Sequence, residues 1–277
     1  MSEDNLSNMK NVLNQFQKKE PVDSTMNDEK YPYEIITLPS EGFYYSEENP
    51  LSSGKIKLRY PTAKHEDILL SKNLLNQQIA IDEFLKSLIV DYVNYSDILL
   101  GDINGIMYAA RILLYGPKYL TEVTCPACGK KTENTFDLAG VEARPIDFEN
   151  INASKGENLF EYTLPKANIK IKFSLLSQKD EQEIKAYTNK MKIKDKDLTT
   201  RYLFIIKEVN GIADKKHIKN FIENEFSSMD SSAFRDYYAT LNPGVDITAE
   251  FVCKECGHQA DMDIPLDKNF FWPSRRI

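Results

Sequence analysis

Alternating strand patterns, each followed by helical patterns, divide the chain into two similar halves. In the first half, residues 34–38 form a strand-like run that Pro39 ends, and residues 55–60 alternate between apolar and charged side chains, as a half-buried strand does. Helical spacing of apolar residues follows, and strand-like residues then surround a turn at residues 125–128. We expect an α+β protein in which short strands flank groups of helices.

The same order returns in the second half. Residues 160–164 form a strand-like run, residues 169–173 alternate, and helical patterns follow, including one expected helix over residues 198–209. A constant shift aligns four pairs of identical residues: Asp102 with Asp230, Gly116 with Gly244, Glu122 with Glu250, and Cys125 with Cys253. We therefore predict an internal duplication, strand–strand–helices–strand–turn–strand, with units at residues 31–145 and 146–277.

Residues 1–30 precede the first unit and form an arm and linker. Apolar side chains at helical spacing predict an amphipathic helix over residues 6–19, and these side chains are Leu6, Met9, Val12, Leu13 and Phe16. A terminal helix of this length is marginally stable unless it docks on another surface. The segment is therefore either a frayed tail or a partner-binding arm, and the sequence favours neither.

All the cysteines lie in two Cys-x-x-Cys-Gly turns, one in each predicted unit. They are Cys125, Cys128, Cys253 and Cys256. Two such turns brought together place four thiolates at the corners of a tetrahedron, which is the geometry of a structural zinc site. The glycine after each pair, Gly129 or Gly257, permits the positive φ that such a turn requires. We predict a single Zn²⁺ ribbon to which each unit contributes two ligands.

Other chemistries fit this cysteine pattern less well. A thioredoxin-like redox pair would open a helix, whereas each turn here lies between strand-like runs. Disulfides suit secreted proteins, and iron–sulfur binding or free thiols remain as further alternatives. Four thiolates leave no open position for water, so a catalytic zinc is not expected. His258 follows the second pair and is interpreted as a solvated neighbour of the site.

The C-terminal segment carries consecutive aromatic residues and the single tryptophan of the chain. The segment consists of Phe270, Phe271, Trp272 and Pro273. Adjacent residues of a strand point to opposite faces, so these side chains cannot all face one core. We predict that they form an interaction surface, because contiguous exposed aromatic residues mark partner sites. The alternative is a tail that folds into a groove of its own domain.

Composition limits the function classes. The chain has 277 residues, 42% of them hydrophobic, and a net charge of −7, which argues against broad binding to nucleic-acid phosphates. The sequence shows no apolar run of membrane-spanning length and no secretory leader, which predicts a soluble, intracellular protein. It also lacks phosphate-binding loops and zinc-protease motifs, so we expect no catalytic residues and no enzyme activity.

Several segments, taken in order, match a known family. They are Leu38-Pro39-Ser40-Glu41-Gly42, Arg59-Tyr60-Pro61-Thr62-Ala63 before an acidic helix start, Ala109-Ala110-Arg111-Ile112 with Tyr115-Gly116, the two cysteine turns, and Phe270-Phe271-Trp272-Pro273. With these segments the chain resembles the baseplate-hub subunit family of T-even-type contractile-tailed phages. The similarity covers roughly residues 31–273.

The resemblance implies a structural or assembly subunit of the central hub of the tail baseplate, without enzymatic activity. Its partners would be other baseplate-hub, tail-tube or tape-measure proteins, and it would reside in the virion after assembly in the host cytoplasm. The alternative is a zinc-ribbon protein that binds nucleic acid, and a metal-dependent enzyme is the least favoured hypothesis. Acidic residues oppose the nucleic-acid alternative, because the turns balance Lys130, Lys131 and Lys254 with Glu133, Glu255 and Asp261.

Overall fold

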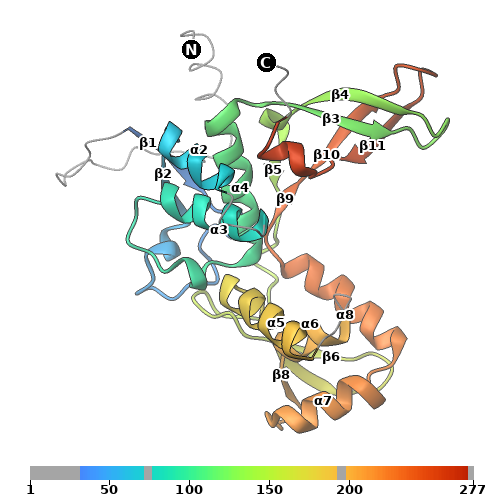
Figure 1. Ribbon diagram of the computed structural model, residues 1–277. Helices are drawn as coiled ribbons and strands as arrows, with labels where there is room; N and C mark the ends of the chain where they lie inside the picture. The colour runs from blue at the N-terminus through green and yellow to red at the C-terminus, as the bar shows by residue number, and fades with distance from the viewer. Residues whose placement is uncertain (1–31, 72–76, 192–197, 274–277) are drawn as a thin grey trace.

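The computed structural model describes residues 32–71, 77–191 and 198–273, so the predicted N-terminal helix lies outside the described residues. Helices and small sheets form two lobes and a projecting arm (Figure 1). The fold is therefore mixed helix and sheet, which confirms the expected α+β class. Within the described ranges, no helix has the length and apolarity needed to cross a membrane.

The first lobe packs helices against a two-stranded sheet. Its elements are β1 (Tyr33–Thr37), a short 3-10 turn (Pro50–Ser53), β2 (Lys55–Arg59), α2 (Ala63–Leu70), α3 (Gln77–Leu88), a second 3-10 turn (Tyr95–Asp97) and α4 (Leu100–Tyr115). The alternation in β2 buries Ile56 and Leu58, while the charged residues between them stay partly exposed. Helix α4 is buried on most of its circumference, which makes it the central element of this lobe.

The second lobe contains a three-stranded antiparallel sheet in the order β6-β7-β8. Its elements are β6 (Phe160–Thr163), β7 (Lys170–Phe173), α5 (Gln178–Met191), α6 (Leu198–Ile205), β8 (Ile206–Val209), α7 (Lys215–Asn224) and α8 (Ser228–Leu241). Stacked and edge-on aromatic rings fill the space between sheet and helices, among them Phe160, Phe173 and Phe234. Such pairs stabilise the lobe beyond simple area burial.

One expected helix is too long. The helix expected over residues 198–209 ends at Ile205, and the following four residues form β8 instead. Ile206 and Val209 are buried there while Lys207 is exposed, and β7 supplies hydrogen-bond partners. Asn210 and Gly211 then turn the chain with φ of 48° and 83°. An Asn-Gly pair with positive φ at both residues is a strong hairpin signal, and here it ends β8, whereas the earlier end of α6 at Ile205 coincides with the pairing of Ile206 with β7.

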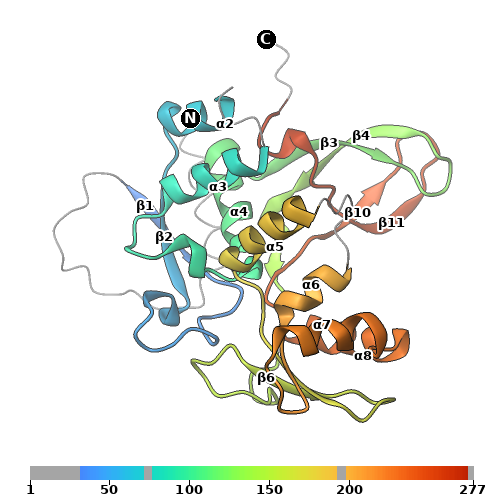
Figure 2. The ribbon, with the colours of Figure 1, turned by 60° about the horizontal axis from the view of Figure 1, so that its bottom comes forward.

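Two β-hairpins, one from each half of the sequence, form the projecting arm. They are β3 (Lys118–Thr124) with β4 (Lys131–Asp137), and β10 (Thr248–Val252) with β11 (Gln259–Asp263). Both views show the hairpins side by side (Figures 1 and 2). Alternate residues of β3, namely Tyr119, Thr121 and Val123, are buried. The arm is thus built from two neighbouring hairpins, one contributed by each half of the sequence.

The two lobes meet through main-chain contacts. The short strands β5 (Glu142–Ala143) and β9 (Val245–Asp246) pair with each other, and the amide of Leu100 donates to the carbonyl of Leu176 over 2.9 Å. At Gly101, an added Cβ would lie 1.9 Å from the carbonyl oxygen of Pro243, so a side chain there would force the start of α4 away from the second lobe. The lobes therefore share a continuous core.

Candidate metal centre

The four cysteines converge at the tips of the two hairpins. All four Sγ atoms lie within 4.8 Å of one another, and the Sγ atoms of Cys125 and Cys256, like those of Cys128 and Cys253, are 3.8 Å apart. Sulfurs at about 2.3 Å from a tetrahedral zinc ion lie ~3.8 Å from each other. The donor set and its spacing therefore fit one metal ion held by two thiols from each half.

The two turns have the same internal hydrogen bonds. The amide of Cys125 donates to the carbonyl of Lys130, and the amide of Cys253 donates to the carbonyl of His258, each over 2.9 Å. Gly129 and Gly257 have φ of 70° and 73°, which confirms the positive φ expected after each pair. These bonds hold both thiols of a turn on the same side of it.

The thiols of the cluster differ in acidity. Desolvation opposes ionisation of Cys125, but the N–H groups of Cys128 and Ala127 outweigh it and lower the pKa of Cys125 to about 7. A main-chain hydrogen bond from His258 favours the Cys256 thiolate, yet desolvation and the neighbouring sulfurs raise the pKa of Cys256 to about 12. Negative charges gathered this closely repel one another, and a bound cation would remove that penalty.

The described part of the chain groups no other set of three or more cysteine, histidine or acidic residues that can hold a metal. A comparison with family models matches residues 43–272 to the T4 bacteriophage base plate protein family. The chain belongs to this family. The match spans both lobes and both cysteine turns of the base plate protein. Neither the curated proteins nor the solved structures yield a match.

Arg111 supports the base of the arm in this base plate protein. Its buried guanidinium donates to the carbonyl of Gly116 over 3.0 Å and lies over the rings of Tyr115, Tyr119 and Phe270, with its carbon 4.9–5.8 Å from the ring centroids. Burial lowers the pKa of Arg111 to about 10. The contacts join α4, β3 and the C-terminal segment, so Arg111 helps to fix where the hairpin leaves the body.

Each lobe also buries one aspartate that anchors a turn. Asp102 accepts hydrogen bonds from the amide and hydroxyl of Ser40, and Asp230 accepts one from the amide of Lys166. Both aspartates are 0% exposed, and both accepted amides directly follow a Leu-Pro pair. The sequence had aligned these aspartates without assigning them a role, because their partners lie more than 60 residues away along the chain.

The C-terminal aromatic segment folds back onto the first lobe. Phe270 and Phe271 are only 3% and 2% exposed, because Phe270 packs on Tyr108 and Phe271 packs on Phe84. Of the four residues predicted to form an interaction surface, Trp272 and Pro273 keep partial exposure, while Phe270 and Phe271 belong to the core. The indole nitrogen of Trp272 donates to the carbonyl of Leu69 over 2.8 Å. A role for this segment in partner binding stays a prediction.

Proposed function

We propose that the chain is a structural or assembly subunit of the central hub of a contractile phage tail baseplate, held together by structural zinc. The observation that carries the proposal is the convergence of four thiols from distant hairpins within a chain of the base plate family. Four sulfur ligands close the coordination sphere of zinc, so the ion would stabilise structure and activate no water. No enzymatic activity is proposed.

The two halves are proposed to be repeats, at residues 31–145 and 146–277. Three features support this. Each half has a strand pair followed by helices and a hairpin, each hairpin carries an identically bonded cysteine turn, and each lobe buries an aspartate at corresponding positions. The metal would then lie between corresponding residues of the repeats. Zinc binding contributes on the order of 10 kcal/mol to folding in small zinc peptides, and here it would act on the joint between repeats.

The alternative, a nucleic-acid-binding ribbon, is less well supported. The turn lysines are already engaged, since the Lys130 ammonium pairs with Glu255 over 2.9 Å and that of Lys131 pairs with Glu122 over 2.8 Å. Lys254 donates to the main-chain carbonyl of Glu133. Phosphate binding requires available positive charge, and this surface offers little of it. A salt-dependent gel shift with DNA and RNA tests the alternative, and tight binding at low salt would favour it.

Proposed partners are the other hub, tail-tube and tape-measure proteins, and the proposed location is the tail baseplate in the virion after assembly in the host cytoplasm. The test is complementation of a phage that lacks the gene. We expect wild-type protein to restore infectious tails and Cys125→Ser not to, with Glu255→Gln as a control that alters the same region and keeps every thiol. Intact tails assembled without the protein would contradict a structural or assembly role.

A further inference from the structure

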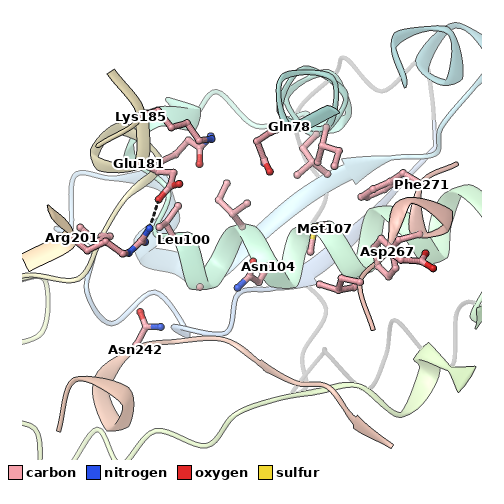
Figure 3. Close-up of a pocket in the computed structure, with 18 of the residues that line it drawn as sticks. Gln78, Leu100, Asn104, Met107, Glu181, Lys185, Arg201, Asn242, Asp267 and Phe271 are labelled. Carbon is pink, nitrogen blue, oxygen red and sulfur yellow. Dashed lines mark hydrogen bonds and ion pairs between the residues drawn. The ribbon is translucent and has the colours of Figure 1, made fainter. Parts of the chain in front are cut away.

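A cavity of about 540 Å³ opens between the two lobes and the C-terminal segment. Figure 3 shows Leu100, Asn104 and Met107 of α4 on one side, Glu181 and Lys185 of α5 on another, and Phe271 at one end. We call it the inter-lobe cavity. Its size lies in the range of about 300–1,000 Å³ that is typical of ligand sites.

Gln178 supplies a buried donor that lacks an acceptor. Gln178 lines the inter-lobe cavity and is 2% exposed. Its side-chain nitrogen, Nε2, has no hydrogen-bond partner in the described structure. The main-chain amide of Gln178 donates to the carbonyl of Ile98, which fixes the residue where the lobes join. A buried donor without a partner destabilises the free protein, so an acceptor that enters the cavity would be bound favourably.

The remaining lining combines apolar contacts and further amides with four charged residues, Glu181, Lys185, Arg201 and Asp267, and the Arg201 guanidinium pairs with Glu181 over 3.0 Å. Leu266 is 48% exposed although it lines the cavity, and Met107 and Trp272 add apolar surface that is partly exposed. Asn104 and Asn242 present side-chain amides, which both donate and accept hydrogen bonds. An extended peptide has unpaired main-chain N–H and C=O groups that match such amides, whereas a helix satisfies these groups internally.

We propose that the inter-lobe cavity binds an extended segment of another tail protein, with a large apolar side chain on Leu266, Met107 and Trp272 and a main-chain carbonyl that accepts from Gln178. The choice of a tail polypeptide as occupant rests on the proposed function. The cavity has room for one large side chain and a few residues of main chain. Aromatic and aliphatic anchors in partly preformed pockets dominate the affinity of such contacts.

The test uses synthetic 15-residue peptides that tile the tail-tube, tape-measure and baseplate proteins of the same phage. Trp272 is the only tryptophan and lines the cavity, so its fluorescence reports occupancy directly. We expect a few overlapping peptides with a large apolar residue to shift the emission saturably. Gln178→Met should weaken them at least fivefold without lowering the thermal midpoint of the free protein, because it removes an unpaired donor at similar volume.

Two further variants complete the design. Asn104→Tyr fills the cavity from an exposed position and should abolish the shift, while Gln259→Met makes the same change as Gln178→Met on the outer face of β11 and should leave it unchanged. The proposal is overturned if no peptide binds saturably, or if Gln178→Met binds equally well. It is also overturned if only a peptide of this chain's residues 262–277 binds, or if the shift reflects self-association. If one of these results is found and the wild-type protein still restores infectious tails in the complementation test, the cavity proposal fails and the hub proposal is unaffected.

Discussion

The buried aspartates of the two lobes do the same anchoring in different surroundings. Asp102 accepts from the amide and hydroxyl of Ser40 and from the hydroxyl of Tyr45, all of which are buried. Asp230 accepts from the amide of Lys166, which is an exposed residue, and from the hydroxyl of half-buried Ser227. The aspartate of the first lobe thus bonds to partners inside the core, whereas the aspartate of the second lobe bonds to partners near the surface.

A buried aspartate that accepts from a turn amide therefore has different further contacts in the two lobes. The Tyr45 hydroxyl that donates to Asp102 also accepts from the amide of Leu99, which lies beside the junction between the lobes. The first anchor therefore reaches the inter-lobe contact, whereas the second stays within its own lobe.

Removing one thiol should affect both halves together. Cys253→Ser takes a ligand from the second hairpin, so we expect metal content to fall from about one ion per chain to almost none. The metal ion, whose binding contributes on the order of 10 kcal/mol to folding in small zinc peptides, would then no longer hold the two hairpins together. Metal analysis and hydrogen exchange of the arm measure this, with Gln259→Ala, at an exposed residue of β11 in the same hairpin, as the control. Exchange that rises in β10 and β11 but not in β3 and β4 would contradict a shared joint.

Removing the two anchors should have unequal effects. Asp102→Ala strips three buried donors of their acceptor, and since each unsatisfied group costs about 1–3 kcal/mol, we expect a loss of roughly 3–5 kcal/mol of unfolding free energy. Asp230→Ala should cost only about 1–2 kcal/mol, because water can reach Lys166 and Ser227. Denaturant unfolding of both variants measures the two losses of unfolding free energy. Equal losses would show that the two anchors are energetically equivalent.

Titration of Asp102 should make the unfolding free energy of the protein depend on pH. Burial raises the pKa of Asp102 from 3.8 to about 6, although Tyr45 and Ser40 donate to the carboxylate and limit the rise. The folded state therefore holds the proton more tightly, and the stability from protonated Asp102 is lost as pH rises from about 4 to 6. At about 1.4 kcal/mol per pKa unit, and with the unfolded carboxyl already partly ionised at pH 4, wild type should lose about 2 kcal/mol relative to Asp102→Asn between pH 4 and 7.

The measurement is denaturant unfolding of both proteins at several pH values between 4 and 7. The cysteines titrate in both proteins, so the difference isolates Asp102. A constant difference across this range would mean that folding does not raise the pKa of Asp102.

The smallest effect is expected at the C-terminal segment. Trp272→Phe keeps an aromatic ring but removes the hydrogen bond to the carbonyl of Leu69, so unfolding free energy should fall by about 1 kcal/mol. Calorimetric or denaturant unfolding measures the change, and Leu159→Ala, at an exposed residue of the second lobe, serves as the control. A loss as large as that of Asp102→Ala would mean that the segment secures the first lobe more than its contacts indicate.

Local chemistry explains which features were predictable. The cysteine spacing and the glycine after each pair specify a turn and a donor set, so Cys125 and Cys253 were correctly placed together across the chain. The alternation in β2 and β7 likewise depends on neighbouring residues alone. The sequence alone could not decide the end of α6, because Ile206 is compatible with helix or strand until β7 provides an edge.

Long-range packing accounts for what the sequence did not reveal. Burial of Phe270 and Phe271 depends on Tyr108 and Phe84, which lie far away in the sequence. The inter-lobe cavity arises only when α4, α5 and the C-terminal segment meet, and nothing local to Gln178 marks it as a donor without a partner. Tertiary contacts of this kind have no periodic or motif signal to detect.

X-ray absorption at the zinc edge, combined with metal analysis of the purified full-length protein, tests the proposed joint between the hairpins most directly. We expect one zinc per chain with four sulfur ligands at about 2.3 Å, two from each hairpin. Cys125→Ser and Cys253→Ser should each abolish the signal. A metal-free protein that keeps its hairpins paired, or a site with nitrogen or oxygen ligands in place of sulfur, would contradict it.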